Sequence, residues 1–331
     1  MFLPQLWSWL WVVALVVVGV TAQDDDDEPE VRRVALRTHS LSPPYLDSDM
    51  RSRWFDFGSD TIVRTDQYIR LTADRPSQQG WLFSRVPITA TNWEVEVEFK
   101  LHGSGNLHGD GFAMWVTKQR ATTGPVFGST DNFEGLGIFF DTYKNNRPGV
   151  SFPYVMAMMG NGNTAYDQAH DGKANEIGGC QARALRESSI PTKARLTYFQ
   201  DKSLTLELQY KSDYSWTKCF SLTPTDDLPI RMPSISYLGF SAGTGELSDN
   251  HDIISVQSHN LYSPTSSRSS SGSTAGDPAR DKRSSNKARK AQRTRNSWLW
   301  FFFKVFLFLV AVVVAYVGFT MYRARQRRAR F

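Results

Sequence analysis

Short stretches of alternating apolar and polar residues recur along the middle of the chain. In residues 93–99, Trp93, Val95, Val97 and Phe99 alternate with three glutamates. A period of two is typical of a β-strand that buries one face and exposes the other. Comparable short runs occur at residues 111–117, 135–140, 154–159, 194–200, 204–210 and 235–242.

Turn-forming residues separate these runs, and no comparable stretch of helical period accompanies them. Gly, Pro, Asn and Asp interrupt the pattern throughout residues 34–262. Many short strands without intervening helices are typical of an antiparallel sandwich. The sequence therefore predicts an all-β domain over 34–262, and its length of roughly 230 residues suits a single sandwich.

Two long apolar stretches flank this region. Residues 2–20 are apolar and end in the small-residue triplet Val20-Thr21-Ala22, which predicts a cleaved signal peptide over 1–22. Residues 298–321 supply the roughly 20 residues that an α-helix needs to span a bilayer. A removed leader and one late span predict a type I membrane protein, with the sandwich in the lumen and residues 322–331 in the cytosol.

Charge is distributed unevenly around the predicted domain. The total of +5 combines +13 from residues 263–331 with −8 from residues 1–262, and the run Asp24–Glu30 in the acidic N-terminal segment 23–33 supplies −6 of the latter. The sandwich itself is nearly neutral, so we expect no nucleic-acid partner. Residues 263–297 are rich in Ser and Arg and nearly free of apolar side chains, which predicts a disordered stalk in the lumen.

The chain has two cysteines, Cys180 and Cys219. In a secretory compartment an isolated pair forms a disulfide more often than a metal site. Two buried free thiols are the alternative.

Carboxylate and amide side chains are concentrated in four short segments. Asp110 lies in HGDGFAMW, Asp141 and Asn145 lie in FFDTYKNN, Asp171 lies in YDQAHDGK, and the fourth segment is GTGELSDNHDI at 243–253. Calcium takes six to eight oxygen ligands from carboxylates, amides, backbone carbonyls and water. The spacing of Asp141 and Asn145 offers two such oxygens from one tight loop, and Asp171 can complete the set from a second loop.

These segments resemble the leguminous-type (L-type) lectins of the early secretory pathway, the intracellular cargo-receptor relatives of concanavalin A. The resemblance rests on NLHGDGFAMW (106–115), GPVFGSTDNFEGLGIFFDTYKNN (124–146), YDQAHDG (166–172) and SAGTGELSDNHDIIS (241–255), in the family's order and spacing. It implies a legume-lectin-like jelly-roll sandwich, with the binding site in loops at the concave face. It also implies that Cys180 and Cys219 form the family's disulfide.

The resemblance implies a role for each site residue. A Ca²⁺ ion is expected to bind the side chains of Asp141, Asn145 and Asp171 and the backbone carbonyl of Tyr143. Mannose is expected to contact Ser77, Asp110, Asn145, Gln168 and the loop Gly245-Glu246-Leu247.

This chain departs from the family at two of these positions. Gln168 stands where the family usually has a histidine, and Glu246 replaces the more usual aspartate. Glutamine still donates a hydrogen bond but cannot titrate, so part of a pH response would be lost. His170 could restore it through its neighbour Asp171; the alternative is a solvated loop histidine.

The resemblance implies a non-enzymatic lectin that binds high-mannose N-glycans on cargo glycoproteins. Its membrane is expected to be that of the endoplasmic reticulum, the intermediate compartment or the Golgi. The basic tail is similar to family tails that contact vesicle coat proteins, with Phe331 as the export signal. The first alternative is an anchored glycoside hydrolase that uses the alternating carboxylates Glu94, Glu96 and Glu98. The second, a structural tether, leaves Asp110 and Asn145 unexplained.

Overall fold

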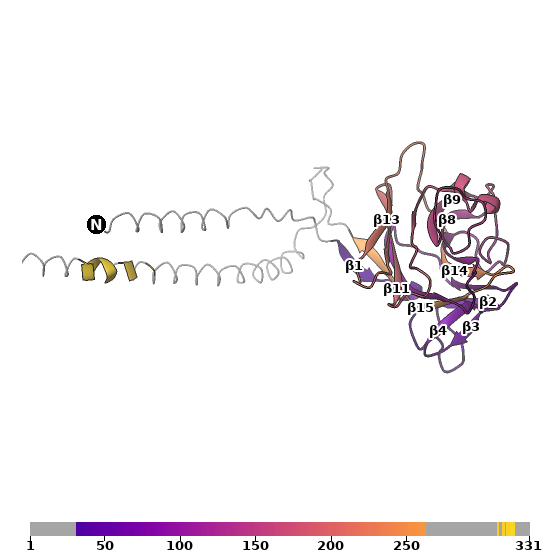
Figure 1. Cartoon of the computed structure of the whole chain (residues 1–331), viewed down its shortest axis with the longest axis horizontal. Helices are drawn as coiled ribbons and strands as arrows, with labels where there is room; N and C mark the ends of the chain where they lie inside the picture. The colour runs from indigo at the N-terminus through magenta and orange to yellow at the C-terminus, as the bar shows by residue number, and fades with distance from the viewer. Residues whose placement is uncertain (1–30, 263–309, 311–312, 315, 322–331) are drawn as a thin grey trace, which may run out of the picture. The chain divides into compact units, whose positions relative to one another are not determined.

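The computed structural model describes residues 31–262, 310, 313–314 and 316–321 (Figure 1). The predicted signal peptide, stalk and cytosolic tail, with most of the predicted span, lie outside the described residues. The chain divides into two units, residues 1–265 and 266–331. Among the described residues, no helix combines the length and apolar character that a membrane crossing requires.

The described residues of the first unit, 31–262, form β-strands and three 3₁₀ turns, as the absence of helical periodicity predicted. The strands are β1 (Arg32–Ala35), β2 (Phe55–Ser59), β3 (Ile62–Arg64), β4 (Tyr68–Thr72), β5 (Gln79–Ser84), β6 (Asn92–His102), β7 (Gly111–Thr117), β8 (Glu134–Asp141), β9 (Tyr154–Asn161), β10 (Gly178–Gln181), β11 (Thr192–Phe199), β12 (Ser203–Gln209), β13 (Thr217–Leu222), β14 (Tyr237–Gly243) and β15 (Asn250–Tyr262). The 3₁₀ turns are η1 (Arg37–His39), η2 (Gln168–His170) and η3 (Lys173–Asn175).

The strands form two antiparallel sheets that pack face to face (Figure 1). The eight-stranded sheet has the order β13-β12-β11-β6-β15-β4-β3, and β1 pairs with the end of β15. The seven-stranded sheet has the order β10-β9-β8-β7-β14-β5-β2. This arrangement confirms the predicted all-β sandwich.

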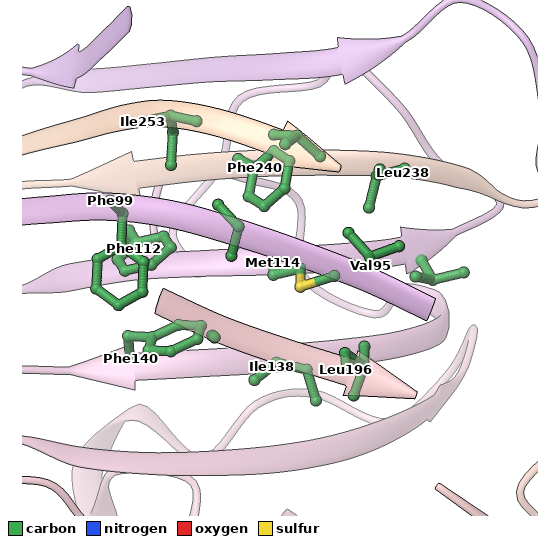
Figure 2. Packing of buried hydrophobic residues seen from close by; sticks show 14 of the residues in the cluster. Val95, Phe99, Phe112, Met114, Ile138, Phe140, Leu196, Leu238, Phe240 and Ile253 are labelled. Carbon is green, nitrogen blue, oxygen red and sulfur yellow. The ribbon is translucent and has the colours of Figure 1, made fainter. Parts of the chain in front are cut away.

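The main core lies between the two sheets (Figure 2). The eight-stranded sheet contributes Val95, Phe99, Leu196 and Ile253, and the seven-stranded sheet contributes Phe112, Met114, Ile138, Phe140, Leu238 and Phe240. Phe112 and Phe140 stack with their centroids 4.4 Å apart, and Phe99 lies 4.8 Å from Phe112. Burying one such ring contributes about 1.5–3 kcal/mol, so this cluster is a major source of the stability that holds the sheets together.

A second apolar cluster covers the outer face of the seven-stranded sheet. Alternate residues of β7, β8 and β9 point away from the main core into this cluster, including Trp115 and Phe139. The loops contribute Phe127 and Tyr166, whose rings lie 5.2 and 4.9 Å from that of Phe139. These strands are therefore buried on both faces, which explains why GFAMWVT and GLGIFF are nearly continuous apolar runs instead of strictly alternating ones.

The predicted disulfide is confirmed. Cys180 in β10 is bonded to Cys219 in β13, with the two Cα atoms 5.1 Å apart. β10 is an edge strand of the seven-stranded sheet and β13 is an edge strand of the eight-stranded sheet. The bond therefore links the two sheets along one side of the sandwich.

Candidate functional site

Strand register brings the first site residues together at one end of the seven-stranded sheet. Gly111, the first residue of β7, lies opposite Asp141 at the end of β8 and opposite Gly243 at the end of β14. Asp110 directly precedes Gly111, so it enters the same region as Asp141. Antiparallel pairing thus places three loops that are distant in sequence at one edge.

Asp171 reaches this edge from the loop between β9 and β10. It follows η2 in a left-handed conformation with φ of 51°, and Gly172 follows with φ of 68°. A Cβ on Gly172 would come within 2.5 Å of Tyr166 Cε2, so this position requires glycine. The tight turn directs the Asp171 carboxylate toward the loop after β8.

The loop after β8 is tied to Asp171 by hydrogen bonds. The backbone N–H of Asn145 donates to both carboxylate oxygens at 3.1 and 3.2 Å, and its Nδ2 donates to Oδ1 at 2.6 Å. The backbone N–H of Arg147 donates to Oδ2 at 3.2 Å. The Asp171 carboxylate therefore holds the loop after β8 against the loop between β9 and β10, and both loops carry predicted calcium ligands.

A pocket of about 210 Å³ lies at this junction. Six of the predicted site residues line it: Asp110, Asp141, Tyr143, Asn145, Gln168 and Asp171. Its other lining residues are Gln79, Pro125, Phe127, Gly128, Tyr166, Gly243 and Thr244. The volume and the polar lining suit a small hydroxylated ligand.

Negative charge accumulates at the base of the pocket. Asp141 is 5% exposed, and its pKa is raised well above the usual value, first by burial and then by the negative charge of Asp171. A hydrogen bond of 3.0 Å from the Tyr143 N–H to Oδ1 opposes this shift. Burial also raises the pKa of Asp110. A bound cation would offset this negative charge, to which Arg147 already supplies a partial counter-charge.

The oxygen atoms at this site fit a hard cation. Within the part of the chain that the structure describes, no three His, Cys, Asp or Glu side chains are grouped to hold a metal. The site instead offers the carboxylates of Asp141 and Asp171, the Asn145 amide and the Tyr143 carbonyl, and calcium accepts such a mixed set.

The Tyr166 hydroxyl also fits a ligand in the pocket. It is buried and has no hydrogen-bond partner in the protein. Burial raises its pKa, and the negative charges of Asp141 and Asp171 add to the effect. A buried hydroxyl without a partner is costly unless a ligand or water satisfies it.

The remaining predicted sugar contacts lie beside the pocket and do not line it. The Ser77 N–H donates to the carbonyl of Gly245 at 3.0 Å. A Cβ on Gly245 would lie 3.4 Å from Asp110 Oδ2, and one on Gly109 would lie 3.7 Å from the Cβ of Leu247. Glu246, between Gly245 and Leu247 in the sequence, is exposed. This loop therefore forms a rim next to Asp110.

Two expectations from the sequence need correction. The segment 243–253 does not enter the site as a unit, because Asn250 already begins β15 and Asp252 forms an ion pair with Arg70 at 2.7 Å. His170 is exposed, as a solvated loop histidine would be, and its Nδ1 lies 3.0 Å from Oδ1 of Asp167, so its carboxylate partner is Asp167 and not Asp171.

The sequence assigned no role to Gln79, Phe127 or Tyr166, which also line the pocket. Tyr166 lies in the motif YDQAHDG, but only the packing of its loop against Phe139 shows which way its ring points. Phe127 likewise lies in the quoted motif 124–146, whereas composition and spacing gave no signal for Gln79.

The alternating glutamates of β6 lie far from this pocket, on the outer face of the eight-stranded sheet. Each is in an ion pair: Glu94 with Arg33 at 3.1 Å, Glu96 with Arg195 at 2.9 Å and Glu98 with Lys193 at 3.8 Å. Glu94 is 5% exposed, and therefore less solvated than the alternation predicted. Cross-strand charge pairing accounts for the spacing.

Comparisons with known proteins agree with this geometry. The model of the legume-like lectin family matches residues 32–268. An L-type lectin-like domain-containing protein of Schizosaccharomyces pombe is 40% identical over 228 residues, which cover 68% of this chain and 71% of that protein. The vesicular integral-membrane protein VIP36 of Homo sapiens is 37% identical over 327 residues, which cover 95% of this chain and 88% of that protein.

A solved structure is similar over the described sandwich. The VIP36 exoplasmic/lumenal domain in its Ca²⁺/Man-bound form has a TM-score of 0.64 and 41% identity, and the match covers 69% of this chain and 92% of that chain.

Proposed function

We propose a function from one premise: this chain belongs to the legume-like lectin family. It is a calcium-dependent lectin that binds mannose in high-mannose N-glycans. The observation that carries the proposal is the pair of buried carboxylates, Asp141 and Asp171, beside Asn145 in one polar pocket. The similar VIP36 domain was solved with both Ca²⁺ and mannose.

Each predicted residue has a role that its position supports. Asp141, Asn145, Asp171 and the Tyr143 carbonyl would hold calcium, which supplies the positive charge that offsets the buried carboxylates. On the sugar side, the Asp110 carboxylate accepts hydrogen bonds from hydroxyls, and the amides of Asn145 and Gln168 donate to them. Ser77 and the loop Gly245-Glu246-Leu247 would complete the rim around the hexose.

Calcium removal and the loss of Asn145 should have the same consequence. Chelation with EGTA, or Asn145→Ala, should reduce affinity for a high-mannose oligosaccharide by about 100-fold or more. Chelation removes the ion that fixes the Asn145 side chain, and Asn145→Ala removes a ligand oxygen together with its sugar contact. Fluorescence anisotropy with and without calcium measures this loss. The control is Asn146→Ala, since Asn146 donates only to the Ala169 carbonyl at 3.1 Å. Full calcium-dependent binding by Asn145→Ala would contradict the role given to Asn145, and a failure of the unchanged protein to bind the oligosaccharide would favour a structural tether.

The protein is proposed to act without catalysis. Retaining glycosidases place two carboxylates across a scissile bond, whereas Glu94, Glu96 and Glu98 each form an ion pair with a basic residue of another strand. Mannoside hydrolysis that disappeared in Glu94→Gln would contradict this view.

We further infer that the lectin is a cargo receptor in transport between the endoplasmic reticulum and the Golgi. The predicted type I topology places the sandwich in the lumen with cargo glycans, and the predicted tail 322–331 with vesicle coats. The VIP36 match, which covers 95% of this chain and 88% of VIP36, supports a common layout.

The tail proposal is tested by changing its last residue. Phe331→Ala should shift the full chain toward the endoplasmic reticulum, because the aromatic side chain is the proposed contact with export coats. Arg330→Ala keeps that ring and serves as the matched control. Imaging of both variants beside organelle markers measures the shift, and an unchanged distribution for Phe331→Ala would exclude the signal.

A further inference from the structure

Two arginines contact the loops around the pocket without lining it. Arg147 is 4% exposed, and the side chain of Arg186 is 11% exposed. Charged side chains are buried only when they are paired, and removing one partner leaves an uncompensated charge. Both arginines contact loops that carry proposed ligand-binding residues, so their partners show what each one supports.

Arg147 supports the cation side. Its Nη1 donates to the backbone carbonyl of Asp171 at 3.1 Å, and its own N–H donates to the Asp171 carboxylate. Its Nη2 pairs with Glu176, which also accepts a hydrogen bond of 2.8 Å from the Tyr154 hydroxyl. The guanidinium lies 4.2 Å from the centre of the Tyr154 ring. Asp171 is therefore held by Arg147, and Arg147 is held by Glu176 and by Tyr154, the first residue of β9.

Arg186 supports the sugar side. It makes a two-point ion pair with Asp249, with Nε and Nη2 each 2.9 Å from a carboxylate oxygen. Asp249 is fully buried and follows the loop Gly245-Glu246-Leu247 by two residues. Nη2 also donates to the carbonyls of Gly103 and Gly105 at 3.2 and 3.1 Å, in the segment that leads to Asp110. One guanidinium thus joins the two loops at the rim.

Asp74 reinforces this junction. It accepts hydrogen bonds from the N–H and hydroxyl of Ser104 at 2.8 and 2.7 Å, and from the hydroxyl of Ser248 at 2.7 Å. The same two loops are therefore joined at two places. The partners of Arg186 and those of Arg147 have no residue in common.

From these contacts we infer that the two arginines are positioning residues with separate tasks. Arg147 orients Asp171 for the cation, and Arg186 orients Asp110 and the rim loop for the sugar. The inference rests on the proposed function, because it assigns support to the two halves of that site. Hydrogen bonds that hold a metal ligand from behind, without touching the metal, set the geometry of that ligand. Their loss typically lowers metal affinity by about 10–100-fold.

The test measures calcium and glycan affinity separately on the full chain. Calcium binding is measured by calorimetric titration, and binding of a high-mannose oligosaccharide by anisotropy at saturating calcium. Arg147→Met should lower calcium affinity by about 10–100-fold and leave glycan affinity unchanged once calcium saturates the site. Arg186→Met should leave calcium affinity unchanged and lower glycan affinity by about tenfold or more, as expected for the loss of charge-assisted hydrogen bonds.

Milder variants protect the test against misfolding. Glu176→Gln and Asp249→Asn weaken the same two ion pairs while keeping side-chain shape, and each should reproduce the selective loss of its arginine partner. Arg183→Met is the matched control, because Arg183 is exposed and donates to Ser151 Oγ at 2.8 Å.

The outcomes separate the inference from the proposed function. If each variant lowers both affinities in parallel, or changes neither, the division of tasks is wrong. If the unchanged protein binds neither calcium nor the oligosaccharide, the proposed function itself fails.

Discussion

Replacing Asp141 with asparagine should abolish calcium and glycan binding and at the same time make the calcium-free protein more stable. The pKa of this carboxyl is raised by burial and by the nearby Asp171, which means that its charged form is unfavourable in the folded state. Asparagine removes the charge and keeps an oxygen that can accept the Tyr143 N–H. Each kcal/mol of relieved repulsion should raise the thermal midpoint by about 2–4 °C.

Asp171→Asn gives the matched comparison. It should also abolish calcium binding, but it should lower the calcium-free midpoint, because the carboxylate accepts the N–H groups of Asn145 and Arg147. Scanning calorimetry in EGTA distinguishes the two variants. A calcium-free Asp141→Asn protein that melts below the unchanged protein would show that Asp141 stabilises the empty site, contrary to the burial argument.

The same carboxyl gives the direction of the pH dependence. A carboxyl whose folded pKa is raised stabilises the calcium-free fold most below its unfolded pKa of about 3.9, and this stability is lost as pH rises through the folded pKa. Calcium binds the ionised carboxylate. The stabilisation that calcium adds should therefore increase as pH rises through the folded pKa of Asp141 and decrease again on acidification. The measurement is the shift of the thermal midpoint when calcium is added, at neutral and at mildly acid pH. Equal shifts at the two pH values would contradict the predicted pH dependence.

Removing the disulfide should cost about 4 kcal/mol of the free energy of unfolding. Cys180 and Cys219 are 39 residues apart in sequence, and closing a loop of that length restricts the unfolded chain by about this amount in entropy models. The double replacement Cys180→Ala, Cys219→Ala should therefore shift a denaturant transition to lower concentration. The bond also anchors β10, which follows the loop that holds Asp171 and Glu176.

Calcium-free unfolding curves of the oxidised protein, the reduced protein and the double variant test this expectation. The reduced protein should behave like the double variant, because both lack only the cross-link. A loss below about 1 kcal/mol would mean that strain or residual structure offsets the entropy gain. Glycan binding by folded variant protein should persist, since neither cysteine lines the pocket.

Strands with an uninterrupted apolar pattern could be predicted from the sequence. Residues 111–117 were predicted as a strand and form β7 with the same bounds. β15 was missed because its outward positions include charged and polar residues such as Asp252 and His259, and because bulges shift its register against β4 and β6. The edge strands β3 and β10 are too short to show a period.

Of the candidate site, only the residues that lie in the family's motifs could be predicted from the sequence. These residues lie in three separate segments of the chain, and the resemblance to the family predicts that the segments meet: Asp110, Asp141 with Asn145, and Asp171. Their supports could not be found in this way. Arg186 contacts Asp249 across 63 positions of sequence, and no local spacing encodes such a partner.

The position of β15 has a consequence for how this protein is made. It is the last strand of the sandwich in sequence, yet it lies in the interior of the eight-stranded sheet, between β6 and β4, and its end pairs with β1. Folds dominated by such distant pairings form slowly. A nascent chain that has not yet emerged to residue 262 lacks the strand that joins its two ends, so the domain completes its fold only after nearly all of it has been synthesised.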